Sequence, residues 1–488
     1  MVKEQVMEIS LRRGFVWPSF EIYGGVKGFY DYGPMGSLLK KNVEEVIRKA
    51  YVIEENCLEV SCPTVSPEDI WVASGHVDSF SDLIAECEKC GEPYRVDHLV
   101  AEKLDIQTDG MGIKELGDLI KKNSIGCPKC KGSLGQIYDY NLMFKTYIGP
   151  GQNKITGYMR PETAQTTYLP FKRLYAIGRE RLPLGIIQIG RSFRNEISPR
   201  QGMIRLREFT QAEIQFFVNP EDKSAENLGD VAQQKVRVLS GAMQEKGSTE
   251  PKEMTIQETL DTGIIKVEMI AYQLARAMQI FERMGIDASK LYLRQHKSDE
   301  RAFYSSDTWD IEYVSQDYGR IELVGISDRS DHDLGAHQEL SKVDMQVNKE
   351  GKKFVPHVVE VAYGVDRPVY CVLESCFVEQ KGDKERTYFK FPTGVAPYQA
   401  AVYPLVKKDG IPEKAREVFD QLKDSGIYVL WDVSGSIGRR YARADEIGVP
   451  YCVTIDYDTL KDGTVTIRNR DSMEQKRVKI SELAKEIV

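Results

Sequence analysis

The chain of 488 residues lacks the features that mark membrane, secreted and repeat proteins. No apolar run approaches the roughly 18 residues that span a bilayer, and the first residues, MVKEQVMEISLRRGF, contain no apolar core of a secretory signal. Internal repeats and low-complexity tracts are also absent, which excludes a repeat architecture. We therefore expect a cytoplasmic protein that has no membrane partner.

An excess of positive charge is missing too. The net charge is −8 at pH 7, which argues against non-specific coating of nucleic acid. The segment from Arg386 onward is the less acidic part of the chain, with 17 Lys and Arg against 15 Asp and Glu. Its densest basic cluster is RRYAR at 439–443. The sequence leaves open whether this cluster is a solvated helix face or a contact to a phosphate backbone.

Cysteine is present in two pairs of regular spacing. Nine cysteines in a cytoplasmic chain predict metal ligands or reduced thiols and argue against a disulfide framework. Four thiolates in two C-x2-C knuckles suit a closed tetrahedral Zn²⁺ site; they are Cys87, Cys90, Cys127 and Cys130. With four protein ligands no position is left for a catalytic water, so we expect structural zinc. Unliganded thiols and a redox-active pair are the alternatives.

The hydrophobic pattern predicts two domains of different type. The first, 1–385, alternates runs of strands with helices and fits an α+β fold with an antiparallel sheet. It includes two apparent insertions, at about 84–136 and 219–301, and the second contains an amphipathic helix at 263–284. The strands that we expect after it cover 308–314 and 320–325.

A charged linker at 379–386 precedes the second domain, 386–488. Strands alternate there with helices, which predicts a small α/β domain with parallel strands. The expected strands are 398–405, 428–431 and 451–455, and the expected helices are 411–424 and 437–447.

A loop rich in arginine is the most informative part of the chain. It joins two expected strands, 186–193 and 204–217, and Arg194, Arg205 and Arg207 lie around it. Guanidinium groups pair bidentately with phosphate oxygens and keep their charge, so this surface suits a polyphosphate. Phe209, beyond the arginines, offers a flat face to a base. The simpler alternative is a hairpin with a solvated charged tip.

The segment FRNEISPR…IRLREFTQAE (193–213) resembles motif 2 of class II aminoacyl-tRNA synthetases. In detail it is similar to the dimeric glycyl-tRNA synthetases of archaea, eukaryotes and some bacteria, and the resemblance covers about residue 15 to the C-terminus. A long helix at 37–52, a strand at 57–65 and Pro63 resemble motif 1, which implies a homodimer interface. The GVDR block (364–367) resembles motif 3, and 386–488 resembles an anticodon-binding domain.

The resemblance implies an ATP site with Mg²⁺. Arg194 would contact the α-phosphate, Arg367 would pair with or stack on ATP, and Glu322 would bind the metal. The catalytic residues on this reading are Arg194, Glu196 and Arg367, acting by positioning and charge neutralisation without a protein nucleophile. The ATP-binding residues are Arg194, Asn195, Glu196, Arg205, Leu206, Phe209, Glu322, Leu323 and Arg367.

The resemblance also implies a glycine site. Glycine has no side chain to grip, so its ammonium group must be held by acids. The glycine-binding residues are Arg160, Glu162, Phe209, Glu213, Glu360 and Ala362. Three carboxylates close together repel one another in the empty site, and we expect each to raise the pKa of the others.

A second polar block, 322–337, contains His332, His337 and several acids. Its alternatives are a metal site and a wall of the active site that contacts the tRNA acceptor end. The resemblance favours the wall, because the two histidines lack a fourth committed ligand.

The expected function is therefore that of a glycine–tRNA ligase, which forms glycyl-adenylate and passes glycine to the 3′ end of tRNA(Gly). The C-terminal domain would read the anticodon, with 435–443 as its most marked block. One alternative is a non-catalytic accessory protein that binds tRNA or DNA, although such relatives generally lose the arginines of motifs 2 and 3. The other is a ligase for another small amino acid, because the Glu-Pro-Ser usual in the family is Glu360-Val361-Ala362 here.

The missing serine gives a first prediction. A methyl group at Ala362 removes one polar contact to glycine, typically about 1 kcal/mol net. Ala362→Ser should therefore lower the KM for glycine in ATP–pyrophosphate exchange. An unchanged or higher KM would contradict this interpretation.

Overall fold

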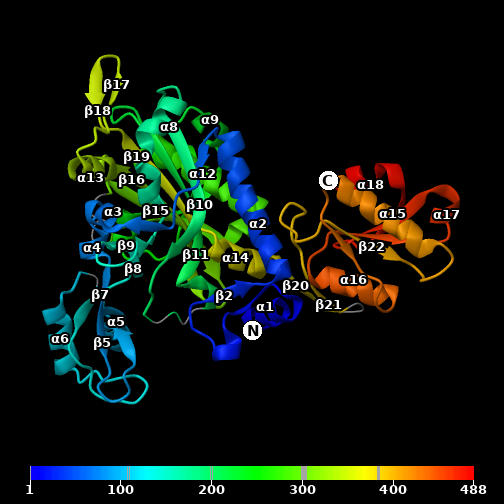
Figure 1. The fold of residues 1–488 in the computed structure, drawn as a ribbon, viewed down its shortest axis with the longest axis horizontal. Helices are drawn as coiled ribbons and strands as arrows, with labels where there is room; N and C mark the ends of the chain where they lie inside the picture. Colours follow the sequence, from blue (N-terminus) through cyan, green and yellow to red (C-terminus); the bar gives the residue numbers. More distant parts are fainter. Residues whose placement is uncertain are drawn as a thin grey trace.

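A computed structural model describes residues 2–106, 108, 110–197, 199, 202–297, 300, 305–381 and 385–487. Residues 198, 200 and 201 of the arginine-rich loop and 382–384 of the expected linker lie outside the described residues. Figure 1 shows three parts: a large body around a twisted sheet, a cysteine-bearing lobe at the lower left, and a C-terminal domain at the right. Within the described residues, none of the helices combines the length and apolar character needed to span a bilayer.

A nine-stranded sheet forms the centre of the large body. Its strands run in the order β13 (Lys252–Thr255), β12 (Lys235–Leu239), β14 (Leu291–Gln295), β15 (Asp307–Ser315), β16 (Gly319–Ser330), β19 (His357–Gly364), β11 (Glu208–Val218), β10 (Leu184–Phe193) and β3 (Leu58–Val60). All neighbours are antiparallel except the pairs β3/β10 and β12/β14. The antiparallel α+β fold predicted from the sequence is confirmed.

The two faces of this sheet differ in chemistry because side chains alternate along each strand. Ile214 and Phe216 of β11 and Val361 and Tyr363 of β19 point into the main hydrophobic core. Three helices pack in that core: α2 (Pro34–Arg48), α12 (Glu268–Arg283) and α14 (Asp366–Cys376). The residues between the apolar ones, Glu213 among them, face the other side and form the candidate site.

Two predicted strands are shorter than expected. The segment 57–65 contains only β3, and β4 (Val65–Pro67) joins a different sheet with β9 (Ile155–Met159) and β8 (Lys145–Ile148). Pro63 lies in the break, since proline has no N–H to give to a sheet. The strand expected at 204–217 starts only at Glu208, because Gly202–Ile204 form a 3-10 turn.

The segment 219–301 is continuous with the central sheet. It contributes β12, β13 and β14 to the edge of that sheet, and the helix expected at 263–284 is α12. The helix expected at 37–52 is α2, which continues as a π-helix over Lys49–Glu54. Leu39, Val43 and Ile47 are fully buried at helical spacing.

The cysteine-bearing lobe runs from β5 (Ser81–Glu86) to β7 (Tyr138–Asn141), so it is slightly longer than 84–136. These two strands pair at the base of the lobe. Between them lie β6 (Pro93–Arg95), α5 (Val96–Leu104) and α6 (Ile113–Lys122), which share a small core of their own. The lobe therefore has its own hydrophobic core, and the chain enters it at β5 and leaves it at β7.

The C-terminal domain has a five-stranded sheet in the order β23 (Val429–Trp431), β22 (Ala400–Pro404), β24 (Tyr451–Ile455), β25 (Thr464–Asn469) and β26 (Gln475–Lys479). The first three strands are parallel and alternate with α15 (Ile411–Asp424) and α16 (Ile437–Glu446), as the sequence predicts. The expected linker is the end of a hairpin, β20 (Phe377–Gln380) with β21 (Arg386–Phe389).

Aromatic packing joins this domain to the large body. Phe389 and Phe391 stack with ring centroids 5.0 Å apart, and the ring of Phe15 meets them edge-on at 5.3 and 5.9 Å. Ala444 of α16 and Ile447 directly after it belong to the same core cluster as the central sheet. The main core therefore continues into the C-terminal domain, which also has a second core of its own around α15.

Candidate active site

A cavity of about 360 Å³ lies on the polar face of the central sheet. It brings together residues that are far apart in the sequence. The predicted site residues that line it are Glu162, Arg194, Glu196, Arg205, Leu206, Phe209, Glu213, Glu322, Leu323, Glu360, Ala362 and Arg367. One end of the cavity is acidic and the other is rich in arginine.

Strand register explains why the acids converge. Glu213 of β11 lies opposite Ala362 of β19, which lies opposite Gly325 of β16. Two positions along β19, Glu360 lies between Gln215 and Ser327 in the same way. Positions two apart on a strand face the same side, so both carboxylates point into the cavity.

Glu213 is held as a neutral acid in the empty site. Burial, followed by the charges of Glu360 and Glu162, raises its pKa to about 8. Its two oxygens accept hydrogen bonds from the Thr163 hydroxyl at 2.6 Å and from Gln211 Nε2 at 2.8 Å. The predicted rise in pKa is therefore found for Glu213, with burial as its largest cause, whereas for Glu162 the prediction is wrong, because its pKa is lowered.

Glu360 and Glu162 differ because they have different partners. Burial raises the pKa of Glu360, although Arg329 Nη1 donates to it at 3.1 Å. Burial would also raise the pKa of Glu162. However, its neighbours His76 and Arg329 hold that pKa well below its usual range, and His76 Nε2 lies 3.5 Å from the carboxylate. Glu162 is therefore the most readily ionised of the three acids.

The arginine-rich end is ordered by contacts among the predicted residues. Arg194 lies between the rings of Phe80 and Phe209, with its guanidinium carbon 5.4 Å from each centroid. Arg205 Nε donates to Glu196 at 2.6 Å. Each arginine thus has a fixed direction before any anion is present.

Arg367 lies on the opposite wall of this end. Its Nη1 donates to the Glu322 carboxylate at 3.2 Å, and its Nε donates to the Ile204 carbonyl oxygen at 3.1 Å. Burial alone would raise the pKa of Glu322, but the positive charge of Arg367 holds that pKa below its usual value.

Two predicted residues lie outside the cavity. The guanidinium of Arg160 is buried and donates to Gln188 Oε1 at 2.9 Å and to the carbonyl oxygens of Arg191 and Cys62. Asn195 turns its amide toward the hydroxyl of Tyr140. Arg160 therefore fixes the chain path beside the site, and a Cβ on Gly190 would lie 2.2 Å from its Nη2.

Several cavity residues were not predicted from the sequence. The His296 ring donates to or accepts from Asp310 at 2.6 Å, and burial raises the pKa of Asp310 to about 6. Gln211, Arg329 and Asp366 also line the cavity. Gln211 and Arg329 alternate with other cavity residues along β11 and β16, and Asp366 directly precedes the predicted Arg367 in the GVDR block; these positions are their sequence signal.

The polar block at 322–337 does not form a metal centre. Asp333 is paired with Arg329 at 2.7 Å, and His337 Nε2 lies 3.0 Å from Gln165 Oε1. Among the residues that the structure describes, only the four knuckle cysteines form a group of three or more His, Cys, Asp or Glu with metal-ligand spacing. The block is instead the wall behind the acidic end, as favoured above.

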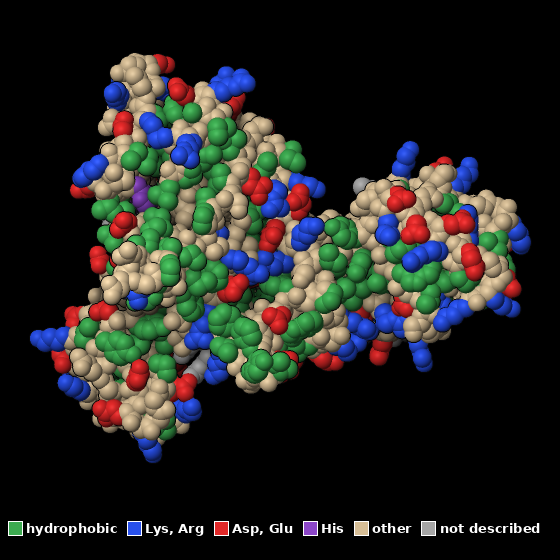
Figure 2. Space-filling model, in the orientation of Figure 1, with side chains coloured by type: hydrophobic (Ala, Val, Ile, Leu, Met, Phe, Trp, Pro, Cys, Tyr) green, Lys and Arg blue, Asp and Glu red, His purple; other side chains and the backbone are tan. Residues whose placement is uncertain are grey.

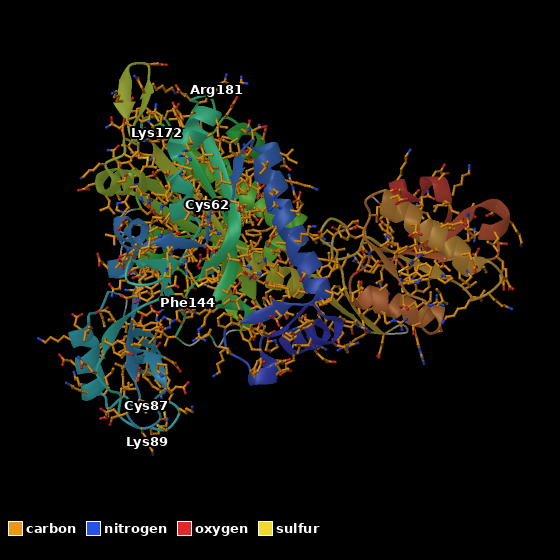
Figure 3. All side chains as sticks on the ribbon, in the orientation of Figure 1. Cys62, Cys87, Lys89, Phe144, Lys172 and Arg181 are labelled. Atoms are coloured by element: carbon orange, nitrogen blue, oxygen red, sulfur yellow. The ribbon has the colours of Figure 1, made fainter. Side chains whose placement is uncertain are left out.

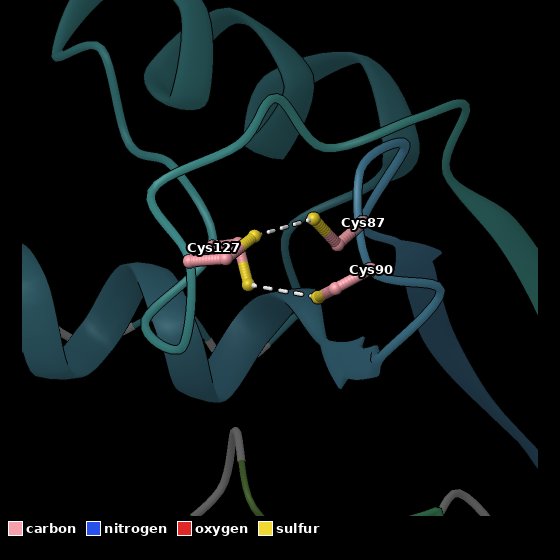
Figure 4. A group of neighbouring side chains, drawn as sticks. Cys87, Cys90 and Cys127 are labelled. Atoms are coloured by element: carbon pink, nitrogen blue, oxygen red, sulfur yellow. Dashed lines mark hydrogen bonds between the residues drawn. The ribbon is translucent and has the colours of Figure 1, made fainter.

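The four cysteine sulfurs converge in the lobe. Cys87 Sγ lies 3.4 Å from Cys130 Sγ, and Cys90 Sγ lies 3.7 Å from Cys127 Sγ (Figure 4). A Cβ on Gly132 would lie 3.2 and 3.3 Å from two of these sulfurs, so the residue next to the second knuckle must be small. In Figure 3 Cys87 and Lys89 lie at the tip of the lobe, far from Phe144 at its base. The cysteines are therefore remote from the cavity.

The basic cluster at 439–443 is mostly internal. Arg440 is buried and donates to the Pro404 carbonyl oxygen, and Arg443 pairs with Asp432, whereas Arg439 is exposed. On the face shown in Figure 2, acidic and basic side chains intermix over this domain. The structure thus leaves Arg439 as the exposed arginine of the cluster.

Comparison with known families agrees with this architecture. Residues 147–376 match the model of the tRNA synthetase class II core domain (G, H, P, S and T), and residues 399–488 match the anticodon binding domain. A solved Giardia lamblia prolyl-tRNA synthetase in complex with prolyl-adenylate shares the fold, with a TM-score of 0.60 over 99% of this chain and 74% of that chain at 15% identity. Fold and site thus define a class II aminoacyl-tRNA synthetase.

Curated relatives narrow the class. The glycine–tRNA ligases of Methanothrix thermoacetophila, Methanocaldococcus jannaschii and Thermococcus sibiricus are 41%, 42% and 40% identical to the chain. The matches cover 97%, 99% and 99% of this chain and 94%, 98% and 98% of those proteins. The chain belongs to the glycine–tRNA ligase family.

The pKa of Glu213 gives a prediction about stability. In the unfolded chain this carboxyl ionises near 4.5, whereas in the folded protein it keeps its proton until about pH 8. Stability from this group is therefore lost as pH rises from 4.5 through 8. Glu213→Gln removes the titration, so its melting temperature relative to the wild type should rise over that window.

The control is Glu482→Gln at an exposed position. Thermal unfolding of all three proteins between pH 5 and 9 provides the measurement. A difference between Glu213→Gln and wild type that stays constant with pH would show that Glu213 is already ionised.

Proposed function

We propose that the chain is a glycine–tRNA ligase that joins glycine to ATP as glycyl-adenylate and then transfers glycine to the 3′ end of tRNA(Gly). The observation that carries this proposal is the acidic end of the cavity, where Glu162, Glu213 and Glu360 converge. Three acids around one small space suit a ligand that is recognised by its ammonium group. Family membership and the anticodon-binding domain support the same activity.

The glycine site works by charge and by lack of room. The ammonium group would lie among the carboxylates, and its arrival offsets the burial of Glu213 and the repulsion from Glu360 and Glu162, which together keep Glu213 protonated. Ala362, opposite Glu213 on β19, and Gly325, opposite Ala362 on β16, offer no side chain longer than a methyl group. The amino acid carboxylate then points toward the arginine-rich end.

The arginine-rich end suits ATP. Arg194 would hold the α-phosphate, Arg205 the phosphate tail, and the base would fit between Phe209 and Arg367. Bound Mg²⁺, with Glu322 as its proposed protein ligand, would neutralise part of the phosphate charge. The carboxylate oxygen of glycine attacks the α-phosphorus, and pyrophosphate leaves.

Transfer to tRNA completes the reaction. A ribose hydroxyl of the terminal adenosine attacks the carbonyl carbon of the adenylate, and AMP leaves. We propose that the C-terminal domain contacts the anticodon, that α2 and β3 form a homodimer interface, and that the protein works in the cytoplasm. Exposed Ile53, in the π-helix that continues α2, supports an interface there, because such a side chain favours burial.

Glycine-dependent ATP–pyrophosphate exchange tests the function. Glycine should support exchange far better than alanine or serine, and Arg194→Ala should reduce it by about 100-fold or more, the scale of removing one stabilising donor at a reacting centre. Exchange that is faster with alanine would favour a ligase for another small amino acid. No exchange with any amino acid, despite tRNA binding, would favour a non-catalytic accessory protein.

We also propose that the four cysteines bind structural Zn²⁺. The test of fit is the sulfur geometry: a tetrahedral Zn–S₄ site with bonds of about 2.3 Å places its sulfurs about 3.8 Å apart, close to the 3.4 and 3.7 Å found here. Bound zinc would hold the two knuckles together and stabilise the small core of the lobe.

Removal of one ligand tests the zinc proposal. The wild type should contain about one zinc per chain, and Cys90→Ser should lose it and make residues 81–141 sensitive to protease. Cys62→Ser, outside the lobe, is the matched control and should keep the metal. Purified wild-type protein with no zinc would contradict the proposal.

A further inference from the structure

Asp366 lies where motifs 1, 2 and 3 meet. It is the first residue of α14, directly before Arg367, and its side chain is 3% exposed although it lines the cavity. Neither oxygen of its carboxylate is free. Oδ1 accepts a hydrogen bond from the Tyr32 hydroxyl at 2.5 Å, and Oδ2 accepts one from the Thr210 backbone N–H at 2.6 Å.

The contact to Thr210 extends the sheet past its last paired residues. The ladder between β11 and β19 ends at Gln211 and Gly364. Beyond that point the Asp366 carboxylate takes the place of a strand carbonyl for the Thr210 N–H, while the Val365 N–H donates to the Thr210 carbonyl oxygen at 2.9 Å. Both backbone groups of Thr210 are therefore bonded to motif 3.

Thr210 is also fixed from the side of α2. Lys40 Nζ donates to its hydroxyl at 2.7 Å, and the same ammonium lies 5.6 Å from the centroid of the Tyr32 ring. The buried carboxylate of Asp366 thus has two hydrogen bonds and the N-terminus of an 11-residue helix to stabilise it. Burial and Asp366 in turn raise the pKa of Tyr32 well above its usual value, so its hydroxyl stays a donor.

The residues on either side of these bonds are the two flat groups of the arginine-rich end. Phe209 precedes Thr210, Arg367 follows Asp366, and both line the cavity. A bond between Thr210 and Asp366 therefore fixes the separation of Phe209 and Arg367. Charge-assisted hydrogen bonds to a buried carboxylate are short and strong, which suits them to holding such a distance.

We propose that Asp366, oriented by Tyr32, is a positioning residue that sets the width of the slot between Phe209 and Arg367 for the base of ATP. The proposal rests on the proposed function for the identity of the ligand. It predicts an effect on ATP and not on glycine, since Glu213 and Glu360 lie within the paired part of β11 and β19, where the ladder between the two strands holds them without Asp366.

The decisive variants are Asp366→Ala and Asp366→Asn. Alanine leaves the Thr210 N–H without its acceptor and frees the slot, so the KM for ATP in exchange should rise about tenfold or more, with the KM for glycine unchanged within about twofold. Asparagine can accept from Thr210 and donate to the Tyr32 oxygen, so it should restore most of the ATP affinity. A purely structural role would move both KM values together.

Tyr32→Phe gives a milder version that keeps the Thr210 bond, and its KM for ATP should rise by a few-fold. Tyr272→Phe is the matched control, because the Tyr272 hydroxyl also bonds a carboxylate, Glu55 at 2.6 Å, outside the cavity lining. It should leave the KM for ATP unchanged.

Calorimetric binding of ATP in the absence of glycine separates the two proposals. If glycine supports no exchange but Asp366→Ala still weakens ATP binding relative to Asp366→Asn, the proposed function fails and the positioning role stands. If Asp366→Ala binds ATP as well as the wild type, or if Asp366→Asn is as weak as Asp366→Ala, the positioning role is overturned.

Discussion

The repulsion among three carboxylates in one small cavity is the constraint on which the rest of the site depends. The alternation of side chains along β11 and β19 places Glu213 and Glu360 on the same face, and Glu162 reaches that face from the segment after β9. Such an arrangement is unfavourable when empty, and the protein relieves it by protonating Glu213 and by pairing Glu360 with Arg329. A cation that enters removes the cost directly. The free-energy cost of placing three acids close together therefore favours binding of a ligand that has a positively charged group.

The opposite end of the cavity is rich in arginine, and its side chains are likewise oriented by neighbouring residues of the protein. Its arginines are already directed by Glu196, Glu322 and aromatic rings before phosphate arrives, so little ordering remains when a nucleotide binds. Motif 2 supplies groups at both ends: Arg194 and Phe209 at one, Glu213 at the other. Phe209 and Glu213 lie on the same strand, β11, so the backbone of that strand fixes their separation. The bond between Asp366 and Thr210 extends this control to motif 3.

Much of this could be predicted from the sequence, because the informative residues lie in recognisable motifs and the strands alternate regularly. The fold class, the elements from β22 to β24, helix α12 and half of the cavity lining followed from those patterns. What failed depended on tertiary contacts. Pro63 lies where the chain passes from β3 in one sheet to β4 in another. The guanidinium of Arg160 donates to backbone carbonyl oxygens, and that of Arg440 is buried and donates to the Pro404 carbonyl oxygen. The roles of His76, Arg329 and Asp366 were invisible, because each acts through a partner that is distant along the chain: Glu162 for His76, Glu360 for Arg329 and Tyr32 for Asp366.

The most direct test of the account is the number of protons released when glycine binds. Near pH 7 Glu213 is mostly protonated in the empty site, and a bound ammonium should drive its pKa below that pH. Calorimetry of glycine binding in two buffers of different ionisation enthalpy should therefore show release of nearly one proton per site in the wild type, and none in Glu213→Gln. If the wild type binds glycine without releasing a proton, the claim that Glu213 is protonated before glycine binds is contradicted.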